Sequence, residues 1–352
     1  MSKVLESWKF IPKTALNSSI GDQEAGEKLN SSSKSAGSFI CYPESGGRID
    51  SLRLPIRNAR TDRAEYERHI LRELGSYKAI QEDESYNNTL LFPFPNRLYQ
   101  GCYSFNGQRY TFPINDSETG NALHGFLFDQ SLQPLAAETD IKQQNMLKAL
   151  HLGFKYAGWR ACYPFNIDVE VFYHFNDKGG FHVDIGVINT GKTAAPIAAG
   201  WHPYFTFGHS IDILELDLPP MRKVHVDQNM IPTGRKSPFS RFLNAPGTDL
   251  SLGQQRFDTC FSLNAFPQHT AGFQSLIYSP VHDFTLAIEQ SSNLPYLQLF
   301  TPADRQSLAL EPVSANINAF RNGEGLCVLE PGEQQSYHIQ ISLHEGRVHR
   351  EK

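Results

Sequence analysis

Hydrophobic and polar residues alternate with a period of two along most of the chain from Ser38 onward, which is typical of strands that bury one face. In IDVEVFYHF, apolar side chains recur at every second position from Ile167 to Phe175, and FHVDIGV repeats this pattern from Phe181 to Val187 after the turn sequence NDKGG. These two segments predict a β-hairpin. The same alternation predicts strands at ILELDL (213–218), FTLAIEQ (284–290) and SYHIQISLHE (336–345).

A second hairpin is predicted around Asn106 and Gly107, because Asn-Gly is the strongest short hairpin signal and aromatic residues alternate on both sides of it in CYSFNGQRYTF. One segment has another pattern. In TDRAEYERHILRELG, residues 61–75, a capping residue, many helix formers and a final glycine predict a short helix. We therefore expect an all-β, antiparallel fold with a minor helical decoration.

The N-terminal residues differ in composition from the rest. The stretch NSSIGDQEAGEKLNSSSKSAG (17–37) is rich in Ser, Asn and Gly, so residues 1–37 are expected to form a partly mobile extension. No internal repeat or shift in composition divides the remainder. Residues 38–352 are therefore expected to form a single domain.

Composition narrows the class of protein. Hydrophobic residues make up 40% and charged residues 20% of the chain, which is typical of a globular protein. A net charge of -5 with no basic block argues against nucleic-acid binding. The five cysteines form no paired motif, and no stretch resembles a signal peptide or a membrane span. We therefore expect a cytoplasmic protein that does not associate with a membrane. We expect it to be a monomer or a weak homodimer.

Several polar residues stand inside apolar or glycine-containing strings, where such a side chain needs a partner or a function. They are Arg97 in PFPNRLYQG, His124 in NALHGF, His202 in GWHPYF, Asp258 in QRFDTCFSL, Gln298 in LPYLQLFTP and Glu311 in LALEPVSANINAF. An imidazole has the ordinary pKa closest to neutrality, so His202 can give or take a proton there. A buried structural histidine is the alternative explanation.

Seven short segments, taken in their order along the chain, resemble the aldose 1-epimerase (galactose mutarotase) family. They are NRL, LHG, HPYF, DQNMIPTG (227–234), FD, the glutamine-bearing strand and LEP. The resemblance extends from about Gly46 to about residue 345. It implies a single antiparallel β-supersandwich domain. It also implies an isomerase that interconverts the α and β anomers of a free aldose, with a small monosaccharide as its partner and with neither metal nor cofactor.

The resemblance implies a role for each residue. His202 is expected to protonate the ring oxygen, Glu311 to take the proton of the C1 hydroxyl, and His124 to support the ring-oxygen side. The chemistry needs such a pair, because opening a cyclic hemiacetal removes a proton from one oxygen and delivers one to its neighbour. The implied substrate-binding residues are Arg97, Asp258, Gln298, Tyr204 and Trp201.

Structural explanations stand beside these roles. His124 can be a turn histidine, Arg97 an ion-pair partner and Asp258 a strand-edge carboxylate, while Trp201, Tyr204 and Phe126 can fill the core. The sequence also departs from the family, which commonly has Asn and a second Gly where this chain has Trp201 and Phe126. In the sugar-6-phosphate branch, HGF is often followed by Ala-Arg, and this arginine is expected to bind phosphate. This chain has Leu127-Phe128 there instead, so a neutral aldose is favoured. The remaining alternatives are a non-catalytic carbohydrate-binding protein, and a mutarotase or isomerase for a phosphorylated or uncommon sugar.

Overall fold

The computed structural model describes residues 37–58, 64–139, 147–243, 249–263 and 272–350. In this part of the chain, most of the regular structure is antiparallel β-sheet, which confirms the expected all-β class. Of the extension predicted at residues 1–37, residues 1–36 lie outside the described ranges. No helix among the described residues is long and apolar enough to cross a membrane.

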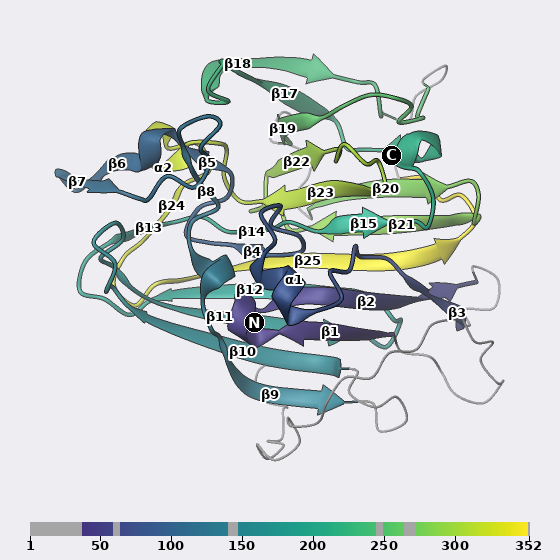
Figure 1. The fold of residues 1–352 in the computed structure, drawn as a ribbon, viewed down its shortest axis with the longest axis horizontal. Coiled ribbons are helices and arrows are strands. Elements are labelled where there is room, and N and C mark those ends of the chain that lie inside the picture. The colour runs from purple at the N-terminus through teal and green to yellow at the C-terminus, as the bar shows by residue number, and fades with distance from the viewer. Residues whose placement is uncertain (1–36, 59–63, 140–146, 244–248, 264–271, 351–352) are drawn as a thin grey trace.

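The larger sheet contains 11 strands (Figure 1). Along the sheet, they are β16 (Glu215–Asp217), β20 (Phe273–Ser279), β21 (Phe284–Gln290), β25 (Gln334–Glu345), β12 (Phe181–Asn189), β11 (Asn166–Phe175), β10 (Leu147–Ala157), β1 (Ser38–Tyr42), β2 (Arg48–Arg57) and β3 (Ala64–His69), with β9 (Gln133–Thr139) on β10. A parallel pairing of β2 with β25 joins two distant parts of this path.

The second sheet contains eight strands. Along the sheet, they are β18 (Pro232–Phe239), β17 (Met221–Val226), β19 (Asp258–Ser262), β22 (Tyr296–Phe300), β23 (Ser307–Val313), β14 (Gly200–Trp201) and β4 (Leu90–Leu91), with β15 (Tyr204–Thr206) also on β23. Every residue of β23 is buried. This strand is therefore central to the sheet and to the molecule.

Three short strand pairs and two short α-helices complete the described elements. The pairs are β5 (Arg97–Leu98) with β8 (Ala122–Leu123), β6 (Cys102–Phe105) with β7 (Gln108–Thr111), and β13 (Ala195–Ile197) with β24 (Cys327–Leu329). The helices are α1 (Tyr77–Gln81) and α2 (Ala319–Asn322), and 3-10 turns cover Pro43–Ser45, Tyr99–Gly101, Leu127–Asp129 and Ile211–Ile213. Figure 1 shows β5 to β8 and α2 grouped beside one end of the second sheet.

The main core is formed by strands in which buried and partly exposed residues alternate, as the sequence predicts. In β11, the residues Ile167, Val169, Val171 and Tyr173 are buried, while the residues between them are partly exposed. Such alternation follows from the pleat, which turns successive side chains to opposite faces. The same hydrophobic cluster includes residues of the second sheet such as Leu310. The two sheets therefore share one core.

The helix predicted at residues 61–75 is wrong. Residues Ala64–His69 form the strand β3, which pairs antiparallel with β2. The helix α1 begins only at Tyr77, where the Ser76 hydroxyl accepts a hydrogen bond from Ala79 N at 3.2 Å as an N-cap. Gly75 therefore precedes the helix instead of ending it. Helix propensity is a weak preference, and pairing with β2 overrides it.

Candidate active site

The polar residues of the second sheet meet because of its strand register. Gly200 pairs with Val313 and Tyr204 with Ala309, so the His202-Pro203 break between β14 and β15 falls opposite Glu311 of β23. On the other side of β23, Gln298 of β22 pairs with Glu311. His202, Glu311 and Gln298 therefore form one row across the sheet.

Asp258 extends this row onto the next strand. Gln298 pairs with Cys260 of β19, and Asp258 lies two residues from Cys260 and thus on the same face. The Gln298 amide donates to Asp258 Oδ1 at 2.6 Å. Three strands and the break between β14 and β15 therefore place four polar side chains together.

His202 and Glu311 form the centre of the site. His202 Nε2 lies 3.4 Å from Glu311 Oε1, and both side chains are less than a tenth exposed. The His202 ring stacks on Tyr204, with ring centroids 5.0 Å apart and planes 3° apart. On the opposite ring edge, Nδ1 of His202 is buried and has no hydrogen-bond partner among the described residues. The protein thus holds the ring firmly but gives it little support for a positive charge.

Burial decides where the proton of this pair lies. It lowers the pKa of His202 to about 3. Burial, and after it the charge of Asp258, raises the pKa of Glu311 well above its ordinary value, and the charge of Arg97 opposes this only in part. The free protein therefore favours a neutral imidazole beside a carboxylic acid. In this state the pair carries one titratable proton, the same number as an imidazolium beside a carboxylate.

His124 approaches the pair from a loop. Its backbone is left-handed, with φ 62°, and Gly125 follows with φ 69°. Asn96 N donates to His124 Nδ1 at 3.1 Å, which assigns the ring proton to Nε2. The His124 and His202 rings meet edge to face with centroids 5.2 Å apart. Burial, the neighbouring His202 and Arg97 keep the pKa of His124 well below its usual value, so it is a neutral donor.

Arg97 and two carboxylates border the same region. Arg97 Nε donates to Asp116 Oδ2 at 2.8 Å, and its Nη2 lies 3.6 Å from Asp258 Oδ2. Burial raises the pKa of Asp258, and Arg97 counteracts this. The guanidinium is therefore shared between Asp116 and Asp258, and hydrogen-bonding atoms for a polyhydroxylated ligand lie close to the His202–Glu311 pair.

The structure thus brings together seven of the eight residues singled out in the sequence. These are His202, Glu311, His124, Arg97, Asp258, Gln298 and Tyr204. Trp201 is the exception: its side chain is fully buried, and its indole N–H donates to Asn88 O at 3.2 Å. Its burial favours the alternative left open by the sequence, in which Trp201 fills the core, over a direct contact with substrate.

Asn96 is a site residue that the sequence reasoning missed. Its backbone N–H binds His124, and its side-chain amide donates to Gln298 Oε1 at 3.1 Å. Its φ of 58° is left-handed, a conformation that Asn tolerates better than most residues. The signal available in the sequence was the position of Asn96 directly before Arg97.

Asn88 is a second residue that was missed, and it supports the site from behind. Its N–H donates to His202 O, and its Oδ1 accepts from Tyr204 N, each at 2.9 Å. Thr89 O accepts from His202 N at 2.9 Å. The segment at residues 83–89 therefore fixes the backbone on both sides of His202.

The chain is similar in sequence to members of a known family. A sequence model of the aldose 1-epimerase family matches residues 37–342. The uncharacterized protein YihR of Escherichia coli (strain K12) is 29% identical over 256 residues, which are 72% of this chain and 77% of YihR.

Solved structures share the fold. A galactose mutarotase-like protein of Clostridium acetobutylicum aligns with a TM-score of 0.73 at 18% identity, over 88% of this chain and 93% of its own. The galactose 1-epimerase of Lactobacillus acidophilus NCFM aligns with a TM-score of 0.67 at 14% identity, over 91% and 94%. These likenesses confirm the expected galactose mutarotase-like β-supersandwich.

Proposed function

The chain belongs to the aldose 1-epimerase family, and from this we propose that it interconverts the α and β anomers of a free aldose by opening and closing the sugar ring. The observation that carries the proposal is the pairing of His202 with Glu311, with Nε2 and Oε1 3.4 Å apart in a buried site. Binding alone does not require an acid beside a base, whereas ring opening does. This favours an enzyme over a non-catalytic carbohydrate-binding protein.

In the proposed reaction, the C1 hydroxyl passes its proton to Glu311 while His202 passes a proton to the ring oxygen. The bond between C1 and the ring oxygen breaks, and C1 becomes an aldehyde carbon. Rotation about the C1–C2 bond presents the other face of the aldehyde, and the reverse proton transfers close the ring. The two residues return to their starting states after each turnover.

The electrostatics of the site suit this sequence of steps. The reactive state has an imidazolium and a carboxylate, and ring opening converts them to a neutral imidazole and a carboxylic acid. That neutral state is the one that burial favours, because burial lowers the pKa of His202 and raises that of Glu311. Burial therefore drives the ring-opening step, and a hydrogen bond from the C1 hydroxyl to the carboxylate helps to form the charged state beforehand.

The surrounding residues have supporting roles in this proposal. His124 stays neutral and directs its Nε2–H at the ring oxygen, whose charge grows as the ring opens. Arg97, Asp258 and Gln298 bind sugar hydroxyls. A neutral aldose fits best, because two carboxylates already balance the Arg97 guanidinium.

Anomer exchange measured by NMR across neutral and phosphorylated aldoses tests the proposal. We expect exchange well above the uncatalysed rate for at least one neutral aldose. Fast exchange confined to phosphorylated sugars would contradict the neutral substrate class. Saturable sugar binding without any exchange would instead favour the carbohydrate-binding alternative.

A further inference from the structure

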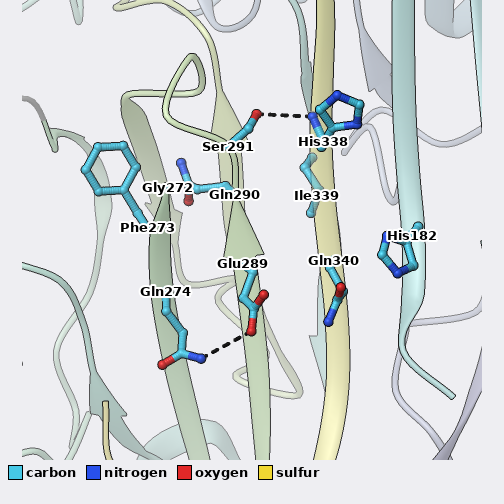
Figure 2. Close-up of a pocket in the computed structure, with 10 residues that line it drawn as sticks. All are labelled: His182, Gly272, Phe273, Gln274, Glu289, Gln290, Ser291, His338, Ile339 and Gln340. Atoms are coloured by element: carbon cyan, nitrogen blue, oxygen red, sulfur yellow. Dashed lines mark hydrogen bonds between the residues drawn. The ribbon is translucent and has the colours of Figure 1, made fainter. Parts of the chain in front are cut away.

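Three histidines and an aspartate gather on the outer face of the larger sheet, whereas the His202–Glu311 pair belongs to the second sheet. The register pairs His174 of β11 with His182 of β12, and Asp184 of β12 with His338 of β25. All four side chains lie on the partly exposed face of these strands, opposite the buried core face. Figure 2 shows His182 and His338 on this face, beside a groove that continues over β21 and β20.

The four side chains are already in contact. His174 Nε2 lies 3.1 Å from Asp184 Oδ2, and His338 Nδ1 lies 2.8 Å from Asp184 Oδ1. The imidazoles of His174 and His182 stack with centroids 4.6 Å apart and planes 7° apart. One ligand atom from each of His174, His182 and Asp184 lies within 4.8 Å of the other two.

A bound metal ion would draw these ligand atoms closer together than 4.8 Å. A tetrahedral zinc ion with bonds of about 2.0–2.1 Å needs ligand atoms roughly 3.3 Å apart. His174, His182 and Asp184 are each partly exposed. Rotation of their side chains would close the remaining gap, and His182 Nε2 would exchange its 3.0 Å contact with Asn176 Nδ2 for the ion. The strands themselves fix the relative positions of the three residues through the ladder of β11 with β12.

We propose that His174, His182 and Asp184 bind one divalent first-row transition-metal ion of the Zn²⁺ class, and that His338 positions the Asp184 carboxylate. Imidazole nitrogen is a ligand that zinc, nickel and copper prefer, whereas magnesium and calcium prefer oxygen ligands. The bound ion links β11 to β12 on their exposed side. Its remaining coordination position faces solvent.

Titration of the full chain, without a histidine tag, with Zn²⁺ in a calorimeter tests this site. We expect one ion to bind per chain, and His182→Ala and Asp184→Asn each to weaken binding by at least about tenfold, since each removes a ligand. His338→Gln is expected to weaken binding about tenfold while the visible spectrum of bound Co²⁺ stays the same, because the ligand set is retained.

A matched control lies on the same face. His151 Nε2 is 3.1 Å from Glu170 Oε2, an equivalent histidine–carboxylate contact on β10 and β11. His151→Ala should leave Zn²⁺ affinity unchanged, and circular dichroism should confirm that each variant is folded. The proposal is overturned if the wild-type chain binds no stoichiometric Zn²⁺, or if binding survives both His182→Ala and Asp184→Asn.

Discussion

At the scale of single residues, the surroundings of Glu311 determine which group carries the proton in the free protein. Burial and the charge of Asp258 raise the pKa of this carboxyl, so Glu311 should remain protonated well above pH 4.5. The ¹³C shift of glutamate carboxyl carbons in labelled protein measures this directly, and Glu311→Gln identifies the resonance. Titration of that resonance near pH 4.5 would contradict the assignment.

The same pair determines the pH dependence of turnover. Only its one-proton form contains both an acid and a base, so kcat/KM should follow a bell-shaped curve in pH. The pKa of His202 is lowered and that of Glu311 is raised. The acidic limb therefore reflects proton uptake by the imidazole, and the basic limb reflects proton loss from the carboxyl. The sequence alone favours the opposite assignment, with the acidic limb from the carboxyl and the basic limb from the imidazole, because motifs carry no information about burial.

His124 offers a separate test at this scale. His124→Asn removes a neutral donor and should slow anomer exchange by roughly 10²-fold, the effect of losing one such donor. The positions of both pH limbs should stay the same, because His124 does not belong to the titrating pair. An acidic limb that disappears in His124→Asn would mean that the two histidines have exchanged roles.

The motifs named most of the residues that meet in the candidate site, since the order of these motifs along the chain is distinctive. They left open whether Trp201 binds substrate or fills the core, and they did not indicate that Asn96 connects His124 with Gln298. Both facts depend on contacts between loops and strands far apart in the sequence. The histidine–aspartate cluster was missed for a similar reason, because it depends on the register of β11 with β12.

At the scale of elements, local patterns succeeded where one strand face is buried and failed where it is not. The hairpin of β11 and β12 matches its prediction because its alternation reflects a buried face. β3 is instead rich in charged residues, and Tyr66 is 41% exposed, so helix formers dominate its local signal. Only pairing with β2 shows that it is a strand.

The segment at residues 83–89 gives a prediction at this scale. Asn88→Ala leaves the buried Tyr204 N–H without its acceptor and should destabilise the protein by about 2–3 kcal/mol in urea unfolding. Anomer exchange should also slow, because the Asn88 side chain fixes the backbone of Tyr204, whose ring stacks on His202. Asn106→Ala is the matched control, since Asn106 is exposed but shares the left-handed backbone of Asn88. Equal losses in both variants would show that backbone conformation alone is responsible.

At the scale of the whole molecule, the catalytic pair and the histidine–aspartate cluster belong to different sheets. The proposed proton transfers use His202 and Glu311 alone, so treatment with EDTA should leave kcat/KM unchanged. Anomer exchange measured before and after chelation checks this. Activity that disappears with EDTA and returns with Zn²⁺ would contradict the separation of the two sites.

The most direct test of the account is anomer exchange by Glu311→Gln, followed by NMR at a saturating concentration of the preferred aldose. Glutamine keeps the shape of the side chain but cannot accept the C1 hydroxyl proton, so turnover should fall by at least about 10²-fold while the sugar still binds. Glu289→Gln, the same change on the exposed side of β21, should leave turnover unchanged. If Glu311→Gln retains wild-type turnover, or loses binding and fold together, Glu311 is not the base that takes the C1 hydroxyl proton.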